Sequence, residues 1–149
     1  MSKFLIEDRP TLTCMIQART PERVSELIKK GLDGGTDAFA IQIDQLEREY
    51  RTESCYRVLF EKMGGKPVYV TDYRNNMSTG MTDGELADEL LTLAKSGAAL
   101  VDVMSDLYCP SKDEITRDSA ADAKQRELIN KIHSYGAEVL MSSHTYRFL

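Results

Sequence analysis

The residues of this sequence that could do chemistry share one property. Each is a polar side chain that lies inside a short apolar run or near its carboxyl end. The set comprises Gln42, Arg74, Asp102, Ser143 and His144. An imidazole titrates near neutral pH and can take or give a proton in catalysis. His144 is therefore predicted to be a general acid or base.

Asp102 lies inside an apolar run, between Val101 and Val103. A carboxylate in such a place must find a partner, because desolvation without one costs several kcal/mol. An imidazole from the next apolar run would be a suitable partner, so the sequence predicts that Asp102 orients His144. The alternative is that Asp102 only bonds a loop amide.

Arg74 directly follows a third apolar run. Its forked donors could hold a carboxylate or a hydroxyl of a substrate. The alternative is an arginine that lies in a loop and contacts only solvent. Gln42 and Ser143 are predicted to contact substrate with Arg74.

Five runs have the apolar character of strands that are buried on both faces; they are 12–16, 37–43, 67–71, 100–104 and 138–141. Helical segments separate them. One begins at Thr20-Pro21-Glu22, with a capping hydroxyl followed by proline, and another begins with the capping box 82–85. Glycines end these segments.

This alternation of strand and helix predicts an α/β fold with a parallel sheet and right-handed crossovers. The whole chain, 1–149, is predicted to be one domain. Two architectures fit: a doubly wound five-stranded sheet, or the N-terminal part of a (βα)8 barrel. In both, the carboxyl ends of the strands form the ligand-binding edge, where the polar residues above would meet.

Composition argues against several classes of function. The 149 residues are 42% apolar, which is enough for a core, and the net charge of -5 argues against a nucleic-acid partner. No apolar run is long enough for a membrane span. Three cysteines without metal-type spacing indicate reduced thiols, no structural zinc and a cytoplasmic location.

From about residue 11 onward, the chain resembles the type I 3-dehydroquinate dehydratases. Four motifs in the family's order carry this resemblance. Met141-Ser142-Ser143-His144 resembles the family's Ser-Asn-His strand end, and Thr71-Asp72-Tyr73-Arg74 resembles its Thr-Phe-Arg. Val101-Asp102-Val103 is similar to the family's Ile-Asp-Leu strand. Ile41-Gln42-Ile43-Asp44 occupies the position of the family's Glu-x-Arg-x-Asp motif.

The resemblance implies a (βα)8 barrel and hence a partial barrel here, with strand order 1-2-3-4-5 and helices on the outer face. It implies a lyase of the shikimate pathway, which supplies the aromatic amino acids, that dehydrates 3-dehydroquinate without a metal or organic cofactor. A lysine on the sixth strand forms a Schiff base with this cyclic hydroxy-acid. In the family, the histidine at the position of His144 is the general acid/base, and the aspartate at the position of Asp102 lies near it. The arginine at the position of Arg74 contacts substrate.

The sequence also departs from the family pattern. Ala40 and Gln42 replace the charged residues of the second strand, and Ser78 or Thr79 stands at the glutamate of the loop after the third strand. No lysine stands at the carboxyl end of a strand, and Lys66 precedes one. The 149-residue chain is therefore expected to be inactive alone.

Two other function classes stay open. The chain could be a degenerate paralogue that binds a partner or assembles without catalysis. A receiver-like signalling domain also has five βα units, but it needs an acidic pair after its first strand, where this chain has Gln17-Ala18. A half-barrel has open sheet edges and exposed apolar side chains, so we expect self-association.

Overall fold

The computed structural model describes residues 2–144. The five strands are β1 (Thr13–Ile16), β2 (Ala38–Gln42), β3 (Val68–Thr71), β4 (Leu100–Met104) and β5 (Glu138–Ser142). The four α-helices are α1 (Pro21–Asp33), α2 (Glu53–Glu61), α3 (Asp83–Lys95) and α4 (Ser119–Ser134). Three short 3-10 helices follow strand ends or lie in loops, at Ile43–Gln45, Arg48–Tyr50 and Asn76–Ser78.

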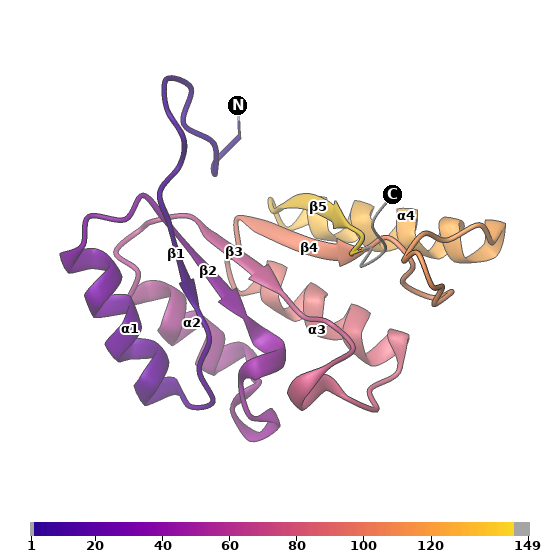
Figure 1. Cartoon of the computed structure of the whole chain (residues 1–149), viewed down its shortest axis with the longest axis horizontal. Coiled ribbons are helices and arrows are strands. Elements are labelled where there is room, and N and C mark those ends of the chain that lie inside the picture. Colours follow the sequence, from indigo (N-terminus) through magenta and orange to yellow (C-terminus); the bar gives the residue numbers. More distant parts are fainter. Residues whose placement is uncertain (1, 145–149) are drawn as a thin grey trace.

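All neighbouring strands are parallel, and the sheet order is β1-β2-β3-β4-β5. The helices lie on one side of the sheet (Figure 1). The predicted α/β class and strand order are confirmed. The doubly wound alternative is wrong, because it would place β1 inside the sheet and helices on both faces.

Strand register decides which side chains face the helices. Ile16 pairs with Ile41, Ile41 with Val70 and Val70 with Val101, and these four side chains are at most 3% exposed. Residues directly paired in neighbouring strands point to the same face, and adjacent residues point to opposite faces. This row is therefore the core layer between the sheet and the helices.

The opposite, inner face of the sheet carries Met15, Ala40 and Tyr69, which occupy the preceding row of the register. Two rows further toward the carboxyl edge lie Asp102 and its partner Leu140. Met15 is 49% exposed and Leu140 is 43% exposed, although both are apolar. No helix covers this face within residues 2–144 (Figure 1).

The helices begin where the sequence predicts. Thr20 accepts a hydrogen bond from the backbone of Arg23 at the start of α1, and proline follows it at the first helical position. Thr82 and Glu85 form a complete capping box at the start of α3. Within residues 2–144, no helix is long and apolar enough to cross a membrane.

The segment that precedes β1 reaches the far edge of the sheet. Ser2 donates to the carboxylate of Glu138 at 2.7 Å, and the Lys3 amide donates to the same carboxylate at 2.6 Å. The Phe4 ring packs edge-on against Tyr69 with 6.1 Å between centroids. Residues 2–4 therefore connect β5 to the inner face of β3 at the amino end of the sheet.

Candidate functional site

A cleft of about 440 Å³ opens at the carboxyl edge of the sheet. Its lining residues follow or end four different strands, and they are Gln42, Tyr73, Arg74, Asn75, Met104, Glu114 and His144. Three of the five predicted site residues, Gln42, Arg74 and His144, are thus brought together. Most of this lining is polar, which suits a small polar ligand.

His144 is held by a glutamate from the loop between β4 and α4. Its Nδ1 lies 2.9 Å from the Glu114 Oε2 atom, and its backbone amide donates to the same oxygen at 2.5 Å. A carboxylate can only accept at Nδ1, so this contact assigns the ring proton to Nδ1. The Nε2 lone pair is then free to accept a proton.

Tyr73 links the histidine to Asp102. Its ring packs edge-on against the imidazole, with centroids 5.0 Å apart and an interplanar angle of 84°. Its hydroxyl donates to Asp102 Oδ2 at 2.7 Å. Burial and the hydrogen bond to Asp102 raise the pKa of the Tyr73 phenol, so this hydroxyl stays a donor.

The predicted pairing of Asp102 with His144 is wrong, because Asp102 is surrounded by hydroxyls instead. Besides Tyr73, Tyr69 donates to Oδ2 at 2.5 Å and Ser142 donates to Oδ1 at 2.6 Å. The register explains the difference. Asp102 pairs with Leu140, and His144 lies four residues further along, roughly 13 Å at about 3.3 Å per residue. The need for partners was predicted correctly.

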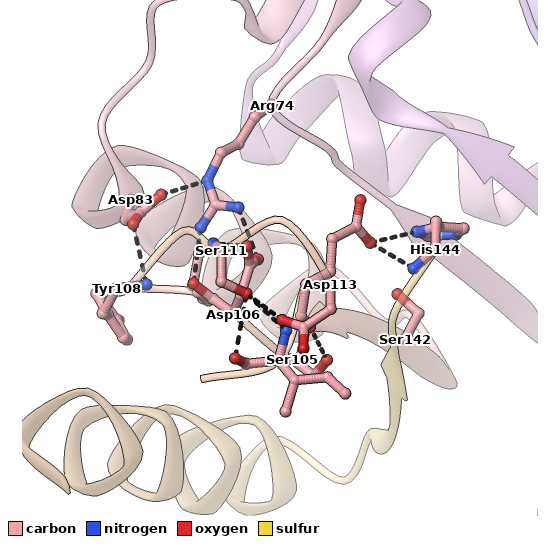
Figure 2. A network of polar contacts seen from close by, with 12 residues as sticks. Arg74, Asp83, Ser105, Asp106, Tyr108, Ser111, Asp113, Ser142 and His144 are labelled. Carbon is pink, nitrogen blue, oxygen red and sulfur yellow. Dashed lines mark hydrogen bonds and ion pairs between the residues drawn. The ribbon is translucent and has the colours of Figure 1, made fainter. Parts of the chain in front are cut away.

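Arg74 lines the cleft, but each of its three guanidinium nitrogens already donates to a protein partner. Its Nε donates to Asp83 Oδ1 at 2.7 Å, its Nη1 to Asp106 Oδ1 at 2.7 Å and its Nη2 to the Asp106 carbonyl at 3.0 Å. Burial lowers the pKa of the guanidinium, and the hydrogen bonds to both carboxylates outweigh this and raise it. Figure 2 shows these contacts.

The two remaining predicted residues have different positions. Gln42 lines the cleft and accepts a hydrogen bond from the Gln17 amide at 2.6 Å. Ser143 is exposed and does not line the cleft. Ser142, one residue earlier, points to the inner face and bonds Asp102, because neighbouring strand residues face opposite sides.

Sequence reasoning missed Glu114 and Tyr73. Glu114 lies in a polar loop of ordinary composition, and its backbone has a left-handed φ of 52° that no sequence feature indicates. Tyr73 directly precedes the candidate Arg74 in the motif Thr71-Asp72-Tyr73-Arg74, and this position was the available signal. Among residues 2–144, no three His, Cys, Asp or Glu side chains could hold a metal ion together.

A second group of polar residues is buried around Asp72. The Asp72 side chain is 0% exposed, accepts from Ser78 Oγ at 2.5 Å and lies 3.7 Å from Arg51 Nη1. Arg51 also lies 3.4 Å from Glu89, whose other oxygen accepts from Tyr56. Burial is the main cause that raises the pKa of Asp72 to about 7.

Comparisons with solved structures show which fold this chain shares. No protein-family model and no curated protein sequence matches the chain. The chain superposes on the 3-dehydroquinate dehydratase of Enterococcus faecalis with a TM-score of 0.73 at 17% identity, covering 97% of this chain and 58% of that one. For the type I enzyme of Clostridium difficile the TM-score is 0.68 at 15% identity, covering 91% and 51%.

A deoxyribose phosphate aldolase from Aeropyrum pernix is also similar, with a TM-score of 0.54 at 18% identity, covering 88% of this chain and 49% of that one. The likeness shows the fold. The chain has the architecture of a partial TIM-type barrel and spans about half the length of the solved structures that it matches. At such identities, the chemistry must be argued from the site itself.

Proposed function

We propose that the chain carries the acid–base half of a lyase active site of the 3-dehydroquinate dehydratase type. His144 is the general base, which takes a proton next to the substrate carbonyl and returns it to the leaving hydroxyl. Glu114 holds the imidazole, and the ligand is a small cyclic hydroxy-acid. The observation that carries this proposal is the contact between His144 Nδ1 and Glu114 at the cleft edge.

Geometry and general chemistry support the assignment. A base must present an unprotonated atom to the substrate, and the carboxylate at Nδ1 leaves Nε2 to do so. The edge-on Tyr73 ring limits rotation of the imidazole. The resemblance of the strand-end motif that carries His144 and the barrel architecture of the matched lyases support the same reaction class.

The Schiff-base step needs an amine that the described cleft does not offer. No lysine is among the residues that line the cleft in the part of the chain that the structure describes. General-base assistance alone accelerates a reaction by roughly 10²–10⁴-fold, whereas enzymes commonly exceed about 10⁶-fold. The isolated chain is therefore expected to be inactive as a dehydratase.

The test uses 3-dehydroquinate and borohydride. We expect no reduced lysine adduct on the 149-residue chain alone, as measured by intact mass. Dehydration should appear when a C-terminal barrel half that carries the lysine is supplied, and it should disappear on His144→Ala. His133→Ala, at an exposed histidine of α4, is the matched control and should leave activity unchanged.

Two outcomes would contradict the proposal. A lysine adduct on the chain alone would show that the nucleophile lies elsewhere. Assembly with the lysine-bearing half but no dehydration would favour the second candidate, a non-catalytic paralogue that binds or assembles. The solved C. difficile enzyme was observed with covalently modified comenic acid, so comenic acid is a further binding probe for this cleft.

A further inference from the structure

The loop between β4 and α4, residues 105–118, is tied to the rest of the protein by Arg74. The guanidinium contacts two carboxylates, Asp83 at the first position of α3 and Asp106 in the loop. Both ion pairs have a nitrogen–oxygen distance of 2.7 Å. The Arg74 side chain is 26% exposed, and the Asp106 side chain is 2% exposed.

Each of these carboxylates uses its second oxygen to hold the backbone of the same loop. Asp83 Oδ2 accepts from the Tyr108 amide at 2.9 Å, and Asp106 Oδ2 accepts from the Ser111 amide at 2.8 Å. Tyr108 has a left-handed backbone with a φ of 72°, which costs energy for a residue with a side chain. The ion pairs therefore fix an unusual path of the loop (Figure 2).

The fixed part of the loop continues directly into Glu114. The Ser111 hydroxyl donates to Asp113 at 2.9 Å and accepts from the Ile115 amide at 2.9 Å, so it spans the turn that contains Glu114. The Ser105 hydroxyl donates to the Glu114 carbonyl. These bonds present the Glu114 carboxylate to His144.

We propose that Arg74 is a positioning residue: its ion pairs with Asp83 and Asp106 fix the β4–α4 loop so that Glu114 holds the Nδ1–H form of His144. Three of the five guanidinium N–H groups are used in these contacts. A substrate carboxylate at Arg74 would have to compete with two protein carboxylates. The catalytic consequence rests on the proposed function, but the positioning itself does not.

The test reads the tautomer of His144 by ¹⁵N NMR of the imidazole nitrogens at about pH 9, above the usual titration range of histidine. The chain has only two histidines, so His133 is an internal reference. In the wild type, we expect the proton on Nδ1. Glu114→Gln should give a mixture of tautomers, because an amide can donate to Nδ1 as well as accept from it. Arg74→Lys should give the same mixture, because lysine lacks the forked donors that contact both carboxylates.

The double variant R74K/E114Q should give the same resonances as E114Q alone, because both changes act through one contact. The His133 signals and circular dichroism report whether R74K folds. If it does not, Asp106→Asn and Asp83→Asn remove the same ion pairs and should also give a mixture of His144 tautomers. Arg126→Lys is the matched control, because Arg126 forms an exposed ion pair on α4 with Asp122. It should leave the His144 resonances unchanged.

Three results would overturn the inference. His144 resonances that move in E114Q but not in R74K, D106N or D83N would show that the ion pairs do not position Glu114. Resonances that move in none of the variants would show that Glu114 does not hold the ring. Weaker binding of 3-dehydroquinate in R74K with unchanged resonances of the free protein would make Arg74 a substrate contact. None of these readouts requires dehydratase activity, so the proposed function can fail separately.

Discussion

Two buried aspartates, Asp102 and Asp72, differ in the number of hydrogen bonds that their carboxyl groups accept. Asp102 receives three hydroxyl donors, from Tyr69, Tyr73 and Ser142. Asp72 receives one hydroxyl donor at Oδ1, and its Oδ2 has no hydrogen-bond partner within residues 2–144. The pKa of Asp72 is accordingly raised, by burial first and also by nearby Glu89 and Asp44, although Arg51 lowers it.

This difference predicts that Asp72 makes stability depend on pH. The pKa is about 7 in the folded protein against an ordinary value of 3.8. Between these values the folded state binds more protons than the unfolded state, so the free energy of unfolding falls as pH rises and is level above about 7. Asp72→Asn cannot ionise. It should therefore be more stable than the wild type at pH 8, by on the order of a few kcal/mol, and this advantage should be smaller at pH 5.

Thermal unfolding from pH 5 to pH 8 checks this prediction. Asp88→Asn, at an exposed position on α3, is the control and should leave the pH dependence of the wild type intact. A variant D72N that is less stable than the wild type at pH 8 would mean that the 3.7 Å contact with Arg51 outweighs burial.

At the scale of elements, α1 approaches the sheet closely at Gly31. A Cβ atom added there would lie 2.6 Å from Phe39 Cε1 and 3.1 Å from Cys14 Sγ. The Phe39 ring is 0% exposed and cannot move aside without disturbing the core. Glycine at this position therefore sets the distance between α1 and the strands β1 and β2.

Gly31→Ala is predicted to destabilise the protein. Overpacking typically costs about 1–3 kcal/mol, whereas alanine gains about 1 kcal/mol in helix propensity over glycine, so a net loss of up to about 2 kcal/mol is expected. Gly84→Ala in α3 is the control. Within residues 2–144, apart from its chain neighbours and its own helix backbone, only Thr82 Oγ1 lies within 4 Å of the added Cβ, at 3.9 Å. Urea unfolding should show G84A at or above wild-type stability, and equal losses in both variants would contradict the packing argument.

The elements show where sequence reasoning succeeds and where it stops. Strand β4 was predicted at its observed bounds, and the capping residues Thr20 and Thr82 begin their helices as expected, because these signals are local. The path of residues 105–118 depends on ion pairs with Arg74, which lies more than 30 positions from Asp106. Such a contact has no local signature, so the role of Glu114 was not predictable.

At the scale of the whole molecule, the sheet formed by residues 2–144 has two open edges and an inner face that no helix covers. β1 pairs only with β2, and β5 pairs only with β4, within the described residues. Met15 and Leu140 expose 49% and 43% of their surface on the inner face, one on each edge strand. Open strand edges beside exposed apolar side chains favour association.

We therefore propose that the isolated chain self-associates through this face. Light scattering at increasing concentration should show species larger than a monomer, and Leu140→Lys should shift the distribution toward the monomer. Val58→Lys is the control, because Val58 is 50% exposed on α2, on the opposite side of the sheet. A monomer at high concentration that binds no hydrophobic dye would contradict the proposal.

The contacts of residues 2–4 with Glu138 and Tyr69 have a consequence for the motion of the sheet. They join positions up to 136 apart in the chain and connect β5 to the inner face of β3 at the amino end of the sheet. We expect these contacts to restrain the amino end of the sheet. A ligand bound at the carboxyl edge would select, among the conformers of that edge, those in which it makes most contacts.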